Sequence, residues 1–175
     1  VLMEQNYPGE GDIRSHFEAV LPALADRRAI RVEGKPVFLI YNPTKLPNPQ
    51  RFTELWRSLA DNAGLPGIYL VGLANQPWEP VANGFDAASS RNHHLVAQNT
   101  PSSWKRKIRT MMRRARGEPE LVFEYSEAVK HFLLAECEEI RRYPCVIPNW
   151  DNTPRSGKRG LVFHNSTPEL FRGHL

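Results

Sequence analysis

Two patterns of hydrophobic residues alternate along the chain: stripes at helical spacing and short, continuously apolar runs. The stripes predict helices over residues 12–25, 49–63, 104–115, 126–140 and from 167 onward. The runs are too short for helices and are typical of strands that are buried on both faces. They predict strands over residues 37–41, 68–73, 84–88 and 145–150.

Residues that start and stop helices support several of these boundaries. Asn48 is a favoured cap, Pro49 suits the first helical position, and Gly64 suits the end of the same helix. The caps expected for other helices are Asp12, Ser126 and Thr167. Two prolines oppose the pattern. Pro22 predicts a kink or an early end in the first helix, and Pro148 removes a ladder donor from the last strand.

Apolar strands that are separated by helices predict an α/β fold with a parallel sheet. About four such β/α units do not close a barrel, for which eight strands are the norm. A small open sheet is the other arrangement that this pattern allows. Because the chain starts outside any domain-like beginning and stops within a helix, we expect residues 1–175 to form a single incomplete domain with both flanks missing.

The positive charge of the chain is concentrated in one segment. The net charge is +4, and residues 105–116 contain seven lysines and arginines, without which the net charge is −3. The apolar stripe of this predicted helix is most simply explained by packing onto the sheet with solvated arginines, so no nucleic-acid partner is expected. The alternative is a basic helix that binds nucleic acid or an anionic surface, in a module without catalytic activity.

The remaining composition is typical of a globular protein and excludes several classes. Hydrophobic residues make up 41% and charged residues 24% of the chain, and no apolar stretch is long enough to cross a membrane. Cys137 and Cys145 lack the spacing of a zinc site or a disulfide framework, which favours a reducing, cytoplasmic location. The sequence does not specify the oligomeric state.

No cofactor or metal is predicted. The chain contains neither the Gly-x-x-x-x-Gly-Lys phosphate loop nor the Gly-x-Gly-x-x-Gly dinucleotide turn. His93, His94 and His164 lack a carboxylate or a second histidine at the spacing that a metal needs, so loop histidines are the better interpretation. The serines lack the Gly-x-Ser-x-Gly context of an esterase nucleophile.

Polar and aromatic residues gather where the predicted strands end. In parallel α/β folds this edge carries the ligand site. Its amides and carboxylates can bind sugar hydroxyls, and its rings can pack against the C–H face of a pyranose. The competing interpretation is that these residues only form turns and pack at the rim. They are Tyr41, Asn42, Thr44, Asn75, Gln76, Trp78, Glu79, Asp86, Asn149, Trp150, Asp151, Asn152, Thr153 and Arg155.

Several segments of this chain resemble one known family. The segments are residues 1–7, 16–24, 31–41, 84–87 and 143–155, and the most specific is Trp-Asp-Asn-Thr-Pro-Arg at residues 150–155. They are similar to the WbsX-type glycosyltransferase family, which is also described as glycoside hydrolase family 99-like. The resemblance implies a TIM-type (β/α)8 barrel, in which the predicted strands would be the fourth to the seventh.

The resemblance also implies an activity on carbohydrate. It points to an enzyme that makes or trims bacterial surface polysaccharide such as lipopolysaccharide O-antigen, and it leaves transferase and hydrolase open. The resemblance further implies a Trp-Ala-Asn-Glu-type motif and an Asn-Glu-Trp-x-Glu-like motif, the second of which would carry the catalytic carboxylates. Both motifs are absent from residues 1–175. No catalytic residue is therefore predicted, and the segment alone should be inactive. The implied substrate-binding residues are Tyr41, Asp86, Trp150, Asp151, Asn152 and Arg155.

Overall fold

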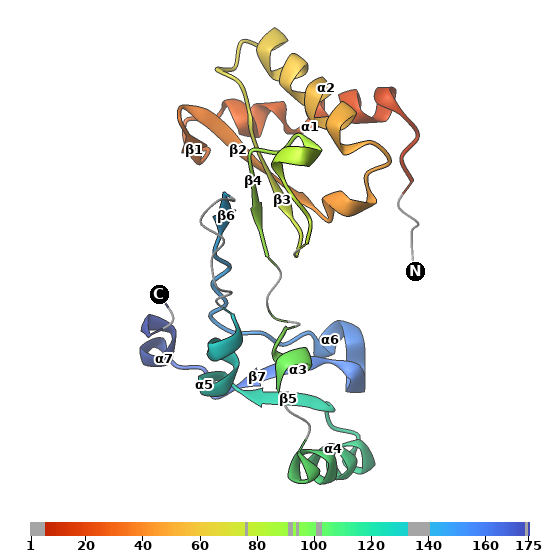
Figure 1. Cartoon of the computed structure of the whole chain (residues 1–175), viewed down its shortest axis with the longest axis vertical. Helices are drawn as coiled ribbons and strands as arrows, with labels where there is room; N and C mark the ends of the chain where they lie inside the picture. The colour runs from red at the N-terminus through yellow and green to blue at the C-terminus, as the bar shows by residue number, and fades with distance from the viewer. Residues whose placement is uncertain are drawn as a thin grey trace. The chain divides into compact units, whose positions relative to one another are not determined.

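The chain forms two compact units (Figure 1), and each has its own hydrophobic core. The computed structural model describes residues 6–75, 77–90, 93, 95–100, 103–132, 141–173 and 175. The first unit combines residues 1–90 with 137–143, and the second combines residues 91–136 with 144–175.

The first unit is a mainly parallel sheet with helices packed on it. Its strands follow the order β1-β2-β3-β4-β6, in which only β1 is antiparallel to its neighbour. The α/β class and the parallel pairing that the sequence predicts are therefore present in this unit. Its elements are α1 (Glu10–Ala25), β1 (Arg31–Val32), β2 (Lys35–Tyr41), η1 (Pro43–Lys45), α2 (Pro49–Asn62), β3 (Tyr69–Leu73), η2 (Val81–Asn83), β4 (Ala87–Ser89) and β6 (Arg142–Tyr143).

The register brings the carboxyl ends of the parallel strands into one row. Tyr41 of β2 lies opposite Leu73 of β3, which lies opposite Ser89 of β4. Tyr143 of β6 lies opposite Ser89 and completes the row. Loops that leave these strands therefore start from a common edge of the sheet.

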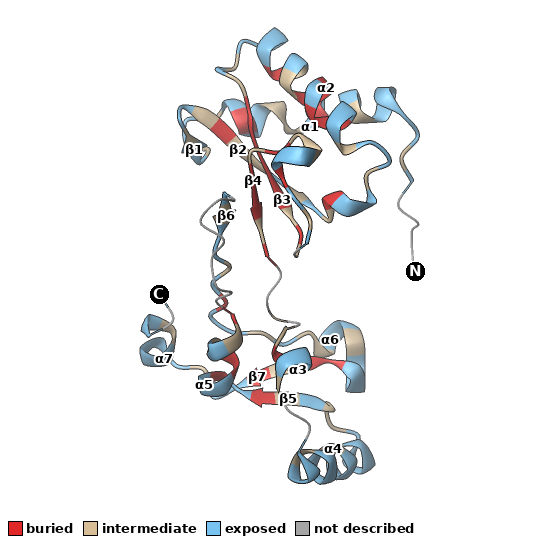
Figure 2. Ribbon diagram, in the orientation of Figure 1, coloured by how far each residue is buried: buried red, intermediate tan, exposed pale blue. Residues whose placement is uncertain are grey.

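The core of the first unit lies between the sheet and the two long helices. Trp56 of α2 is fully buried at its centre, and its ring stacks on Phe38 and Phe52 at centroid distances of 4.6 and 5.2 Å. Phe17 of α1 meets the same indole edge-on at 5.3 Å. Figure 2 shows the buried residues of this unit along α2 and β3. The amphipathic stripe of α2 thus covers the face of the sheet that carries Phe38.

The two long helices differ in how well the sequence predicted their ends. As expected, Asn48 caps α2, and its side chain accepts a hydrogen bond from the Arg51 N–H at 2.9 Å. In contrast, α1 begins at Glu10, so Asp12 lies within the helix and does not cap it. A kink or an early end was predicted at Pro22, and the early end is wrong, because α1 continues to Ala25. The kink stays a prediction. Pro22 is exposed, so water can satisfy the carbonyl that loses its partner.

The second unit is built around a short parallel pair of strands. Strands β5 and β7 pair over four residues, from Leu121 opposite Leu161 to Glu124 opposite His164. Tyr125 and Phe132 are fully buried in its core. The Tyr125 hydroxyl donates to the Ile147 carbonyl at 2.6 Å, and burial raises the pKa of Tyr125. The elements are α3 (Leu95–Asn99), α4 (Trp104–Arg116), β5 (Leu121–Glu124), α5 (Tyr125–Ala128), η4 (Val129–His131), α6 (Thr153–Ser156), η5 (Gly157–Arg159), β7 (Leu161–His164) and α7 (Pro168–Arg172).

The strand predicted at residues 145–150 is wrong. Pro144 and Pro148 cannot donate to a ladder, and the parallel strand that joins the first sheet is the preceding β6. Instead, the end of this segment runs beside β7, where the Phe163 N–H donates to the Trp150 carbonyl at 2.9 Å. The strand predicted at 84–88 starts later, at Ala87.

Two predicted helices have different outcomes. Of the helix predicted over 126–140, residues 126–131 are helical, within α5 and η4, and residues 133–140 lie outside the described part of the chain. The helix over 104–115 is confirmed as α4, with Ser103 as its cap. Its predicted packing onto the sheet is wrong, because no residue of α4 is buried. In Figure 2 this helix is largely pale blue, the colour of exposed residues.

Gly160 offers a test of packing in the second unit. It is buried just before β7, and a β-carbon there would lie 2.6 Å from Thr153 Cγ2 and 2.9 Å from Thr153 Cα. We expect Gly160→Ala to lower the free energy of unfolding by about 2 kcal/mol, because the backbone of α6 must move. Gly173→Ala is the matched control, since its β-carbon would make only ordinary contacts. Equal urea-unfolding midpoints for the two variants would contradict this close packing.

Candidate functional site

The carboxyl edge of the first sheet carries an exposed aromatic ring. Tyr41 ends β2 and its side chain is 68% exposed. At the other end of the same row, the Tyr143 hydroxyl donates to the Tyr69 hydroxyl at 3.1 Å, and this hydrogen bond raises the pKa of Tyr143. The edge therefore presents the phenol of Tyr41, which can pack against and hydrogen-bond a polyhydroxylated ligand, whereas the Tyr143 hydroxyl reaches the buried Tyr69 at the amino end of β3.

The loop after β3 is anchored to the sheet. Trp78 packs edge-on against Phe85 at 5.2 Å, and its ring occupies the space that a β-carbon of Gly72 would need. Arg142 of β6 donates to the carbonyls of Ala74 and Trp78, the first at 3.2 Å. The Trp78 ring is thus part of the packing of this loop. No pattern in the sequence indicated the role of Arg142, because this role depends on a contact between distant segments.

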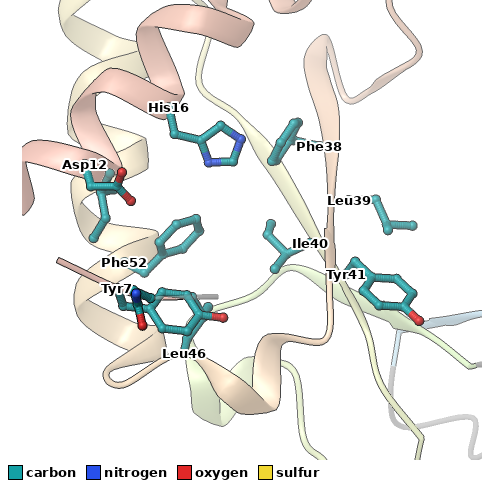
Figure 3. Close-up of a pocket in the computed structure, with 11 residues that line it drawn as sticks. Tyr7, Asp12, His16, Phe38, Leu39, Ile40, Tyr41, Leu46 and Phe52 are labelled. Carbon is teal, nitrogen blue, oxygen red and sulfur yellow. The ribbon is translucent and has the colours of Figure 1, made fainter. Parts of the chain in front are cut away.

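A cavity of about 370 Å³ lies beside β2. Figure 3 shows Asp12 and His16 of α1 on one side of it and Phe38 and Ile40 of β2 on the other. Leu39 and Tyr41 point to the opposite side of the strand. The eleven lining residues are Asn6, Tyr7, Asp12, Ile13, His16, Phe38, Leu39, Ile40, Tyr41, Leu46 and Phe52.

The lining of this cavity does not fit glycosidic catalysis. Asp12 is the only acid among its lining residues, so the pair of carboxyl groups that glycosidic cleavage normally needs is not present there.

The cavity also borders a strand edge. Within the part of the chain that the structure describes, residues 37–41 of β2 pair in register only with β3. Asp12 and His16 are four residues apart on one helix, a spacing that places both side chains on the same face. This spacing is the feature of the sequence that could have indicated the cavity.

Asp86 occupies a different position from the one that the sequence suggested. Because β4 begins at Ala87, Asp86 lies at the amino end of that strand, away from the row that Tyr41 joins. Its Oδ2 accepts hydrogen bonds from the Leu70 N–H at 2.8 Å and from Arg57 Nη2 at 2.9 Å. Arg57 also donates to the Gly84 carbonyl at 2.7 Å. These contacts hold α2 to the segment that leads into β4, so the Asp86 carboxylate stabilises the fold.

The Trp-Asp-Asn-Thr-Pro-Arg segment lies in the second unit, where it forms a turn beside β7. Asn152 Oδ1 accepts the Leu161 N–H at 2.7 Å, and Asp151 Oδ1 accepts the Thr153 N–H at 2.8 Å. Hydrogen bonds from Thr153 lower the pKa of Asp151. This contribution to stability is therefore present at neutral pH and is lost as the pH falls through the lowered pKa. Asp151 and Arg155 are exposed, so both can reach a ligand.

Trp150 is held more tightly than its neighbours. Its indole stacks on the His93 ring at a centroid distance of 4.2 Å and packs against the core of the second unit. Its buried N–H has no hydrogen-bond acceptor among the described residues. In the same part of the chain, no group of three or more His, Cys, Asp or Glu side chains could hold a metal ion.

The structure thus divides the predicted sugar-binding residues between the two units. Tyr41 and Asp86 lie in the first unit, at the carboxyl end of one strand and the amino end of another. Trp150, Asp151 and Asn152 lie in the second unit together with Arg155. One shared pocket for all six residues stays a prediction. None of the helices described in the structure is long and apolar enough to cross a membrane.

The parallel strands and the helices that cover them define a mixed α/β protein. Comparison with known families is more specific: this chain belongs to the glycosyltransferase WbsX family, whose model matches residues 1–175. The family resemblance seen in the sequence is therefore confirmed.

Known relatives and one solved structure resemble this chain. The chain is 26% identical over 176 residues to the "Uncharacterized protein WxcX" of Xanthomonas campestris pv. campestris strain B100, and equally to that of a second strain. It spans 24% of the length of these curated relatives. A solved structure described as "Glycoside hydrolase-like protein" matches with a TM-score of 0.56 at 15% identity, over 98% of this chain and 48% of that one. This likeness concerns the fold.

Proposed function

We propose that residues 1–175 are part of a (β/α)8 barrel in a cytoplasmic carbohydrate-active enzyme. The enzyme would act on glycosidic bonds in bacterial surface polysaccharide such as lipopolysaccharide O-antigen. The observation that carries this proposal is the match of the whole chain to the glycosyltransferase WbsX family. The exposed ring of Tyr41 at the carboxyl edge of parallel strands supports it, because barrel enzymes bind substrates at that edge.

The open edge of β2 supports a larger barrel. Residues 38–41 can accept a further parallel strand, and the neighbouring cavity has apolar walls that side chains of such a strand would fill. The chain also covers 24% of its curated relatives and 48% of the structural neighbour, which leaves room for the remaining strands in the parent protein. Residues 1–175 would then form one incomplete barrel domain.

The catalytic carboxylates are proposed to come from outside residues 1–175. Cleavage of a glycosidic bond normally needs two carboxyl groups, about 5–5.5 Å apart for retention and about 6.5–9.5 Å for inversion. Asp86 is engaged by Arg57 and a backbone N–H, and Asp151 is engaged by Thr153. Both are better suited to structure or to binding hydroxyls than to acid and base catalysis. In this proposal Tyr41, Trp150, Asp151, Asn152 and Arg155 line the sugar site, while Asp86, at the amino end of β4, holds α2 to the sheet.

Calorimetric titration of the intact parent protein with bacterial polysaccharide fragments tests the proposal. Asp151→Ala should weaken binding by about 10- to 100-fold, because a hydrogen bond to a charged group is lost. Asp151→Asn keeps an acceptor for Thr153 and should show how much of the loss depends on the charge. Asp61→Ala, an exposed aspartate at the end of α2, is the matched control and should bind normally. The proposal would be contradicted if the parent protein bound none of the glycans, or if Asp151→Ala bound them as tightly as the original protein.

A further inference from the structure

Helix α4 presents its apolar side to solvent, contrary to the usual arrangement in a globular protein. Four large apolar side chains on it are exposed: Trp104 by 68%, Ile108 by 48%, Met111 by 69% and Met112 by 48%. At about 100° per residue these positions lie within an arc of about 100°, together with Ala115. An amphipathic helix of a folded unit normally buries such an arc.

The opposite side of α4 is the one that contacts the second unit. Arg106 is half-buried, its Nη2 donates to the Thr100 carbonyl at 3.0 Å, and its guanidinium lies 5.6 Å from the centre of the Phe123 ring. Arg113 approaches Glu118 at 3.7 Å, just beyond the helix end. Because Arg106 lies about 170° around the helix from the centre of the apolar arc, these contacts direct that centre away from the unit. Met111, at one border of the arc, lines a cavity together with Leu121 of β5.

Exposed cations border the apolar arc. Lys105, Lys107, Arg109 and Arg116 are all exposed, and residues 103–117 contain no acidic side chain. An apolar arc bordered by cations, with a tryptophan among its members, is the pattern of helices that lie in the interface of a lipid bilayer. Anionic headgroups would neutralise the cations while the acyl boundary receives the apolar side chains.

We propose that α4 binds the surface of an anionic phospholipid bilayer, lying in its plane with the apolar arc toward the lipid. A nucleic acid would neutralise the same cations but would leave Ile108, Met111 and Met112 in water, so it fits the exposed arc less well. At 13 residues the helix is about 20 Å long, which suits an interfacial position and not a spanning one. This inference is independent of the carbohydrate function.

Co-sedimentation of the full 175-residue chain with vesicles tests the proposal. Vesicles with about a quarter phosphatidylglycerol in phosphatidylcholine should bind the chain, and pure phosphatidylcholine should bind it at least about tenfold more weakly. Ile108→Gln with Met111→Gln should weaken binding to the anionic vesicles at least about tenfold by removing apolar contact. Lys105→Gln with Arg109→Gln should weaken it about 30-fold by removing two charges. Glutamine keeps the helix propensity in both variants.

The control changes exposed apolar residues elsewhere. Ile30→Gln with Val81→Gln removes side chains that are 77% and 72% exposed in the first unit, and should leave vesicle binding unchanged. The intact parent protein should bind the same vesicles. The proposal is overturned if neutral vesicles bind equally well, if the α4 variants bind like the original chain, or if the intact parent fails to bind because its own chain covers the arc. Salt-sensitive binding to duplex DNA that the Ile108 and Met111 changes do not weaken would overturn it in favour of nucleic acid.

Discussion

Trp56→Ala is expected to lower the free energy of unfolding by about 4 kcal/mol, the largest effect among the substitutions considered. The indole is fully buried and contacts the rings of Phe17, Phe38 and Phe52, so its removal leaves a large cavity where α1, α2 and the sheet meet. Urea denaturation followed by circular dichroism should show a lower midpoint for the first unit.

Two further tryptophan substitutions make this prediction specific. The buried Trp56 N–H has no acceptor among the residues that the structure describes, so Trp56→Phe removes an unsatisfied donor and should cost about 1–2 kcal/mol. Trp104→Ala, on the exposed arc of α4, should change stability by less than about 0.5 kcal/mol. A similar loss for Trp56→Ala and Trp104→Ala would contradict the core described here.

Asp86→Ala is expected to lower the free energy of unfolding by about 3 kcal/mol. The substitution leaves the Leu70 N–H and the Arg57 guanidinium without the carboxylate oxygen that accepts from both. The loss should be smaller than for a deeply buried pair, because the Asp86 and Arg57 side chains are 23% and 36% exposed. Thermal or urea unfolding measures it directly.

Asp86→Asn separates the two contacts. An amide oxygen can still accept from Leu70 but no longer pairs as a charge with Arg57, so this variant should lose about half as much stability. The result also tests the predicted sugar-binding role. Normal stability of Asp86→Ala, with lost glycan binding by the intact parent, would show that this carboxylate serves a ligand and not the fold.

Some features of this fold are readable from short stretches of sequence because their causes are local. The strand at β2 follows from a continuous apolar run, and α2 follows from its stripe together with Asn48 and Pro49. The family is likewise evident from segments such as residues 150–155. These features depend on residues that are close together in the chain.

Other expectations failed or changed because they depended on distant partners. The apolar run at 145–150 resembles a strand, but Trp150 at its end lies beside β7 instead. Strand β7 has only four residues, which is too short a pattern to predict a strand. Asp86 was expected near the end of a strand, but it lies just before the start of β4. There its carboxylate accepts hydrogen bonds from Arg57 and from the Leu70 N–H. Periodicity located α4 correctly but gave no information on which side would face the unit.

By itself, the sequence determined the family, the α/β class, the parallel strands β2 and β3 and the caps of α2 and α7, since spacing, propensity and capping act over a few residues. Only the tertiary structure decided the task of Asp86, the anchoring of Trp78 by Arg142 and the outward direction of the α4 arc. Each of these features depends on contacts between segments far apart in the chain, and the periodicity of a single segment cannot predict such contacts.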